Sequence, residues 1–281
     1  MSVGDMKPIT TTRPTSDTTG TYAFFTLACG ITWLLALPAA SAWMHHRTPP
    51  PSAVACAGLS AFGPLLAALA IAGPRRQLGR VFGRWRTRPA WILLALCAAP
   101  LVHLVATALF VAIGGHPTRW FHPPGTPEAV AALVVFPLGE EFGWRGFAHP
   151  RMVDRFGPVR GCLIVGAVWG LWHLVYSVTP EAAGFDTFAF ALTVVELPLY
   201  ALLIGWVFER ANRSMAVAIA FHLGAHLDHI ERAPRTDLRL HLLHVAVLTA
   251  SAAFAARSLY RQRRPSERSW SPEPIAARKS V

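Results

Sequence analysis

The sequence predicts an all-α, polytopic membrane protein with about eight transmembrane helices. Of its 281 residues 53% are hydrophobic and only 15% are charged, too little charge for the surface of a soluble enzyme of this length. The apolar residues also come in long blocks separated by arginine-rich connections, as expected for helices that cross a bilayer.

Eight apolar segments are candidate spans. In chain order they are Tyr22 to Met44, Ser52 to Gly73, Ala90 to Gly114, Pro127 to Phe147, Pro158 to Val178, Phe185 to Val207, Met215 to His229 and Leu240 to Tyr260. The fourth and the seventh are the least hydrophobic, because both contain ionisable residues. The spans make up a transmembrane domain over residues 22–260, with its chemically distinctive core at 127–230.

Polar tails flank this domain. Residues 1–21 are rich in Thr and Ser and have no apolar core, so we expect a disordered tail and no cleavable signal peptide. Residues 261–281 are polar, basic and interrupted by proline, which also predicts a disordered tail.

Arginine placement predicts the orientation. The connection after the second span contains Arg75, Arg76, Arg80, Arg84, Arg86 and Arg88. The next connection contains only Arg119. The positive-inside rule places the first connection in the cytoplasm, and alternation of the spans then places both termini there. The Ala- and Arg-rich composition suggests a high-GC bacterium, so we expect an integral protein of a bacterial plasma membrane.

The net charge of +11 comes almost entirely from arginines in connections and tails. It indicates contact with the headgroups of the lipid bilayer, and no basic stripe interleaved with aromatic residues points to nucleic acid. The four cysteines stand singly in apolar segments, so neither a disulfide framework nor a thiolate metal site is predicted.

The fourth span ends in GEEFGWRGFAHPR, residues 139–151, which places two adjacent carboxylates and an arginine where burial makes charge costly. Glu141 and Arg145 are one helical turn apart and can form an ion pair. Glu140 then needs a proton, a metal or a histidine to be tolerated in the membrane.

Histidines on two other spans can meet that need. On the fifth span Gly166, Gly170 and His173 share a face, so the face suited to close helix packing also carries the histidine. On the seventh span His222 and His226 are one turn apart and project from the same side. We expect these side chains to meet the acidic cluster in a cavity within the membrane region.

Other buried ionisable residues are expected to have supporting roles. His103, His241 and His244 are each predicted to be hydrogen-bonded packing residues. Glu196 lies near Pro198 and is predicted to support the site or to distort its helix.

Three motifs give the chain a family resemblance. They are Glu140-Glu141-x-x-x-Arg145, Trp169-x-x-x-His173, and His222 followed four residues later by His226. The series resembles that of the CAAX prenyl protease and bacteriocin-processing family, whose members are intramembrane proteases often described as metalloproteases. Trp169 stands where the family usually has Phe, and His226 stands where it usually has Asn or Asp.

The resemblance implies an intramembrane endopeptidase whose site includes all six ionisable residues of these motifs. Chemically, Glu140 is the candidate general base, and His173 would hold the water. His222 and His226 would stabilise the oxyanion. In a second version, zinc is held by Glu140, His173 and His222 and activates the water. The residues alone leave the metal-free and the zinc version open.

The expected substrate is a hydrophobic peptide or a membrane-anchored protein that reaches the cavity from the bilayer or the cytoplasm. Two other functions stay open. The first is a non-catalytic bacteriocin-immunity or scaffold protein of the same fold, which His226 favours. The second is a proton-coupled transporter, although the chain shows none of the internal repeats typical of transporter halves.

Overall fold

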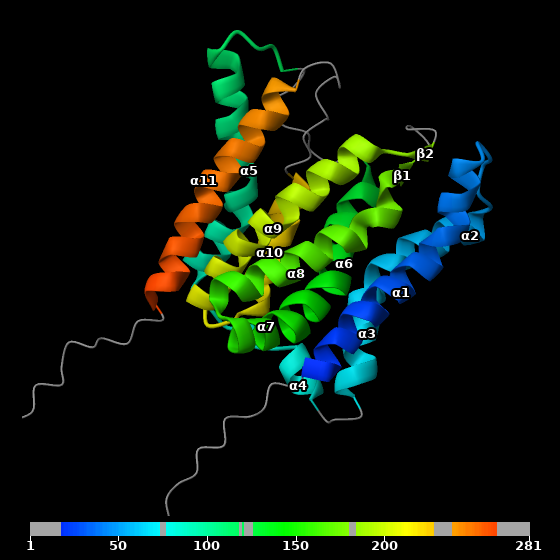
Figure 1. The fold of residues 1–281 in the computed structure, drawn as a ribbon, viewed down its shortest axis with the longest axis horizontal. Coiled ribbons are helices and arrows are strands. Elements are labelled where there is room, and N and C mark those ends of the chain that lie inside the picture. Colours follow the sequence, from blue (N-terminus) through cyan, green and yellow to red (C-terminus); the bar gives the residue numbers. More distant parts are fainter. Residues whose placement is uncertain are drawn as a thin grey trace, which may run out of the picture.

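A computed structural model describes residues 18–73, 77–117, 120, 126–179, 184–227 and 238–262, most of which are helical (Figure 1). The α-helices are α1 Thr18–Met44, α2 Pro51–Leu59, α3 Gly63–Ala72, α4 Leu78–Val81, α5 Pro89–Ala112, α6 Pro127–Gly143, α7 His149–Phe156, α8 Pro158–Trp172, α9 Thr187–Arg210, α10 Met215–Leu227 and α11 Arg239–Gln262. Shorter helical segments are the 3-10 helix η1 Ser60–Phe62, the π-helix η2 Trp144–Ala148 and the 3-10 helix η3 His173–Ser177. A small antiparallel hairpin consists of β1 Val178–Thr179 and β2 Gly184–Phe185.

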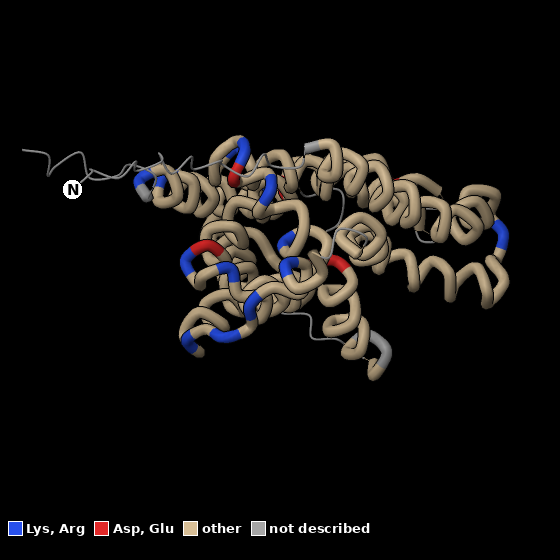
Figure 2. The backbone as a smooth tube through the Cα atoms, turned by 90° about the horizontal axis from the view of Figure 1, so that it is seen from below, with Lys and Arg blue, Asp and Glu red and all other residues tan. Residues whose placement is uncertain are grey.

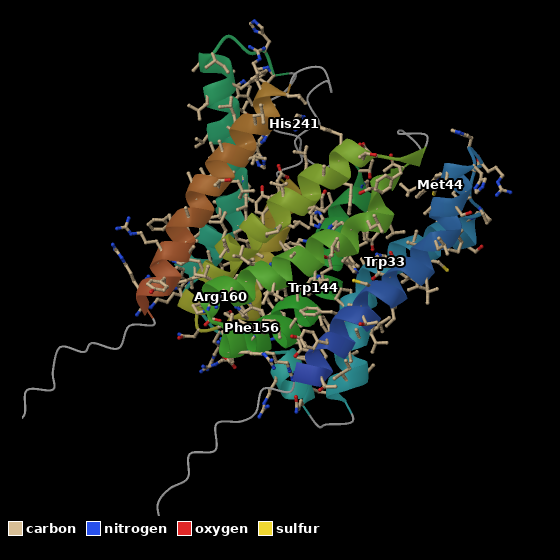
Figure 3. All side chains as sticks on the ribbon, in the orientation of Figure 1. Trp33, Met44, Trp144, Phe156, Arg160 and His241 are labelled. Carbon is tan, nitrogen blue, oxygen red and sulfur yellow. The ribbon has the colours of Figure 1, made fainter. Side chains whose placement is uncertain are left out.

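The helices lie side by side in three groups (Figure 1). Helices α6, α8, α9 and α10 are central; on one side α3 contacts α6 and α1 contacts α8, and on the other α5 contacts α10 and α9 while α11 contacts α9. Trp144 is fully buried in the interior and packs edge-on against Phe24 of α1 and Trp172 of α8 (Figure 3). Large aromatic side chains therefore join the first group to the central one.

Local signals set several helix starts. Pro51, Pro89 and Pro158 each lie in the first helical turn, where a missing N–H removes no helical hydrogen bond. Helix α9 begins after Asp186, whose carboxylate accepts a 2.9 Å hydrogen bond from the N–H of Ala189. These caps explain why the observed helices begin close to the predicted spans.

The chain is an all-α polytopic membrane protein. Among the described residues, six helical segments are long and apolar enough to cross a membrane: Thr19–Met44, Pro51–Ala72, Pro89–Ala112, Pro158–Ser177, Thr187–Arg210 and Arg239–Arg261. Their outer surfaces expose large apolar side chains such as Leu34, Leu242 and Phe254, at 73%, 67% and 63%. Such exposure suits lipid and would be costly in water.

The predicted number of eight spans is not confirmed. The fourth and seventh candidates correspond to α6, which continues into η2, and to the 13-residue α10, and neither is among these six segments. At about 1.5 Å per residue α10 is roughly 20 Å long, shorter than a hydrocarbon core of about 30 Å. Both helices belong to the central group, so neighbouring helices surround their ionisable residues.

Both predicted tail boundaries need correction. Helix α1 begins at Thr18, so the end of the tail predicted at 1–21 is helical, and Thr21 is fully buried there. Helix α11 continues to Gln262, past the predicted boundary at 261. Packing thus extends both helices beyond the apolar runs that defined the spans. The rest of both predicted tails, 1–17 and 263–281, lies outside the described residues.

Charge is unevenly distributed over the backbone. Figure 2 shows long helical stretches without charge, while Lys and Arg gather mainly over one part of the molecule. The first described helix begins, and the last one ends, on the same side of the molecule (Figure 1).

Candidate functional site

The three motifs meet inside the central group of helices. The acidic motif lies at the end of α6 and in η2, the second motif at the end of α8, and the two histidines of the third on α10. The predicted close face of α8 is confirmed, because a Cβ added at Gly166 would meet the backbone of Pro198 and Leu197 on α9. This contact directs the end of α8, with His173, into the space between α9 and α10.

The predicted ion pair between Glu141 and Arg145 is confirmed. An N–H of Arg145 donates to Oε1 of Glu141 over 2.9 Å, and both side chains are buried, at 1% and 0% exposed. The same carboxylate oxygen lies 2.7 Å from Nδ1 of His222, a contact between α6 and α10 that the sequence did not predict. Glu141 therefore joins two helices, with an arginine that offsets its charge.

Glu140 is held by a different residue. Nε1 of Trp169 donates a 2.9 Å hydrogen bond to Oε2 of Glu140, and Glu140 is only 4% exposed. The carbonyl of Trp169 also accepts a 2.8 Å hydrogen bond from Nδ1 of His173. The sequence suggested that Trp169 shapes a cavity, but not that its indole would bind the unpaired carboxylate, because that contact joins different helices.

The two Nδ1 contacts indicate which ring nitrogen of each histidine carries the proton. A carboxylate and a carbonyl can only accept, so Nδ1 of His222 and Nδ1 of His173 carry the protons. In the neutral rings both Nε2 atoms are then acceptors. Nε2 of His222 lies 4.0 Å from Oε1 of Glu140, too far for a direct hydrogen bond. His226 stacks on His222 with ring centroids 4.9 Å apart and planes 13° from parallel.

A cavity of about 250 Å³ adjoins these residues. Its lining includes Trp169, His173, His222 and His226, and continues along α9 and α11. Glu140 is not among the lining residues; it reaches the cavity wall through its contacts with Trp169 and His222. The structure thus brings all six predicted site residues together and places Glu140 just behind the wall.

The metal set predicted at Glu140, His173 and His222 has suitable donor chemistry, since both histidines have Nδ1 tied to an acceptor, as in many metal sites. The spacing does not fit. Within the described segments no group of three or more His, Cys, Asp or Glu side chains is close enough to hold a metal ion. We therefore derive no chemical step through a metal.

A second polar cluster lies on the far side of the same cavity. His244 on α11 places Nδ1 3.0 Å from Oε1 of Glu196 and Nε2 3.2 Å from the hydroxyl of Tyr200. His103 on α5 contacts Thr107 over 3.4 Å. These contacts confirm the prediction that His103 and His244 are hydrogen-bonded packing residues. His241 instead packs edge-on against a phenylalanine ring, and its Nε2 has no hydrogen-bond partner among the described residues.

A third cluster connects α7 to the turn after α9. Nε2 of His149 lies 3.1 Å from Glu209, and Arg213 donates to both oxygens of Glu209 over 2.9 and 3.1 Å. Burial lowers the pKa of His149, and the hydrogen bond with Glu209 opposes that shift only in part. His149 is therefore neutral at pH 7, and this cluster anchors the helix that follows the acidic motif.

Comparisons with known proteins agree with this geometry. Residues 122–227, which contain all three motifs, match the family described as Type II CAAX prenyl endopeptidase Rce1-like. The chain is also 25% identical over 167 residues to CAAX prenyl protease 2 of Methanococcus maripaludis, an alignment that covers 54% of this chain and 60% of that relative. The chain thus spans about three fifths of the length of this curated relative. Residues 122–227 are thus similar to the Rce1-like CAAX prenyl endopeptidase family, and the three motifs that they contain converge on one site.

Proposed function

We propose that the protein is an intramembrane endopeptidase that hydrolyses a peptide bond in a membrane-associated protein or peptide. The observation that carries this proposal is the position of Glu140. Its carboxylate is buried, oriented by the N–H of Trp169 and separated by 4.0 Å from an unprotonated ring nitrogen of His222. A buried carboxylate that is oriented by an N–H donor and lies outside the Glu141–Arg145 ion pair suits a general base.

The proposed reaction uses a water molecule beside Glu140. A separation of 4.0 Å allows one water to contact both Oε1 of Glu140 and Nε2 of His222. Glu140 takes a proton from this water as the water attacks the peptide carbonyl, and later returns the proton to the departing amine. Nε2 of His222 accepts the water's other hydrogen and fixes its orientation, while His173 lines the cavity beside it.

The hydrogen bond with Glu141 changes the part that His222 can take. With Nδ1 bonded to Glu141, neutral His222 has no N–H directed at the cavity and cannot stabilise an oxyanion as a donor. We assign the donor role to His226, which lines the cavity and stacks on His222. His222 in turn orients the water, and its own ring is held in place by the hydrogen bond to Glu141.

Substrate entry and orientation complete the proposal. The peptide reaches the cavity from the bilayer or the cytoplasm, in a plasma membrane with both termini in the cytoplasm. Because Glu140 lies behind the cavity wall, substrate binding has to shift Trp169 or His222 to open the last step of the path.

The position of Glu140 behind the cavity wall also favours a second function, that of a non-catalytic protein. A protein whose general base is closed off from the cavity, and which has His226 where the family usually has Asn or Asp, would serve as an immunity or scaffold protein without turnover. This alternative predicts that Glu140 can be replaced without functional loss.

The test is cleavage of a membrane-anchored peptide library by the purified protein in nanodiscs, for wild type and Glu140→Gln, with and without a zinc chelator. We expect cleavage by wild type and none by Glu140→Gln. Glu141→Gln is the contrast: it weakens a buried pair with Arg145 and should lower the unfolding temperature, whereas Glu140→Gln should not.

Each outcome separates the alternatives. Loss of cleavage in Glu140→Gln alone supports glutamate-activated water without a metal. If wild-type cleavage is also lost on chelation and is restored by added zinc, Glu140, His173 and His222 would have to close around a metal when substrate is bound. If wild type cleaves nothing, and cells with Glu140→Gln keep the same bacteriocin immunity as wild-type cells, the immunity or scaffold function would be favoured.

A further inference from the structure

The cavity continues beyond the site described above, between α9 and α11. There its wall contains Glu196, Tyr200, His241 and His244, together with apolar side chains of α9 and α10. None of these four residues takes part in the proposed hydrolysis. The volume of about 250 Å³ is just below the range of about 300–1,000 Å³ typical of small-molecule pockets, so a side chain or a short peptide segment suits it.

Hydrogen bonding orients the polar groups of this wall. Nδ1 of His244 lies 3.0 Å from Oε1 of Glu196, and a carboxylate oxygen accepts, so Nδ1 is the donor in this bond. Nε2 of His244 is then an acceptor for the hydroxyl of Tyr200. The bond from His244 occupies one of about four acceptor sites of the Glu196 carboxylate.

Glu196 is accessible from the cavity, since its side chain remains 19% exposed while His244 is 2% exposed. No Lys or Arg is present among the described residues that line the cavity. A carboxylate on a largely apolar wall, with no Lys or Arg among the described lining residues, attracts a positively charged group from a ligand.

His241 gives a second, independent sign of a ligand. It lies near the start of α11 (Figure 3), one helical turn before His244. It is 4% exposed and lines the same cavity. Its Nε2 is buried without a hydrogen-bond partner among the described residues. Such a nitrogen is costly to bury unless a bound group reaches it, and it can accept a hydrogen bond from a donor that also contacts Glu196.

We propose that this end of the cavity is a subsite for a basic side chain, Lys or Arg, of the peptide substrate. An ammonium carries three donors and a guanidinium five, enough to serve Glu196 and His241 together. The rings of Tyr200 and Phe221, which also line the cavity and pack edge-on with centroids 6.3 Å apart, favour a cation further. The inference rests on the proposed peptidase function, because the same cavity touches His173 and His222.

The experiment compares lipidated, fluorescent peptides that differ only in one residue, Lys, norleucine or Glu, placed at successive positions around the cleaved bond. Binding is measured to the protein in zwitterionic phosphatidylcholine nanodiscs, and cleavage is measured in parallel. We expect Lys at one position to strengthen binding about tenfold over norleucine, as one charge-assisted hydrogen bond would. Glu at that position should weaken binding.

Glu196→Gln keeps the shape of the side chain and its bond from His244 but removes the charge, so it should abolish the preference for Lys. Asp154→Asn is the matched control, because it removes an acidic charge that is 61% exposed outside the cavity, and it should retain the preference. Equal binding of the three peptides, or a Lys preference that persists in Glu196→Gln, would overturn the inference. A Lys preference in binding without any cleavage would overturn the peptidase function and leave the basic subsite standing.

Discussion

At the scale of single residues, Trp169 has the largest influence on the site. Its Nε1 binds Glu140, its carbonyl binds His173, and the guanidinium of Arg145 lies 4.6 Å from the centre of its ring. The ring also packs edge-on against His222. One side chain therefore contacts Glu140, the ion pair and a histidine at once, and the phenylalanine usual at this position could reproduce only the ring contacts.

Replacing Trp169 by Phe tests the role of the indole N–H. A hydrogen bond to a charged group contributes about 1.5–3 kcal/mol, so kcat should fall roughly 10- to 100-fold while KM stays near the wild-type value. Steady-state kinetics on a cleaved peptide measures both constants. Trp206→Phe is the matched control, since it removes an indole bond to Ser258 far from the site. Equal kcat values for the two variants would show that the N–H of Trp169 does not orient Glu140.

At the scale of elements, the π-helix η2 decides where the acidic motif lies. It follows α6 directly, is entirely buried and carries Arg145. Its neighbour Gly146 lies against the backbone of Val81 in α4, and a Cβ at Gly146 would overlap the carbonyl of Val81. Only glycine permits this close approach, which holds Arg145 within reach of Glu141.

Gly146→Ala should therefore push η2 away from α4. Overpacking of this kind typically costs about 1–3 kcal/mol, and we expect a lower unfolding temperature in detergent together with weaker cleavage. Gly30→Ala in α1 is the control, because a Cβ there meets nothing within 4 Å. It should leave the unfolding temperature unchanged or raise it slightly, since alanine is the better helix former. A Gly146 variant as stable as the Gly30 variant would show that η2 tolerates displacement.

At the scale of the whole molecule, the cavity exists only because distant segments pack together. Its wall combines residues of α8, α9, α10 and α11, and the polar contacts of His244 join α11 to α9 across the membrane interior. Interhelical hydrogen bonds of this kind contribute about 0.6–2 kcal/mol each in membrane proteins. Helices α6 and α10 are not among the six segments identified as candidate spans, and they pack against helices that are.

Topology can be tested on the intact protein. With both termini in the cytoplasm, a C-terminal green fluorescent protein should fluoresce and a C-terminal alkaline phosphatase should be inactive. Alkaline phosphatase inserted between α5 and α6 should be active, because the positive-inside rule places that connection outside. An active C-terminal phosphatase would reverse the orientation and move the arginine-rich connection after the second span to the outer face.

The sequence by itself determined the fold class, the approximate helix positions and the residues of the candidate site. Glu141 and Arg145 could be paired in advance because residues four apart on a helix are neighbours whatever surrounds them. The position of Gly166 likewise predicted which face of α8 packs closely.

Only the tertiary structure decided how separate helices meet. The bond from His222 to Glu141, the bond from Trp169 to Glu140, and the position of Glu196 on the wall of the same cavity all depend on helix rotation and depth. Periodicity along one helix contains no information on the rotation of its neighbours, which is set by how side chains interlock across each interface. The number of spans depends on the same packing, because a short helix such as α10 is stable inside the bundle only when longer helices shield it from lipid.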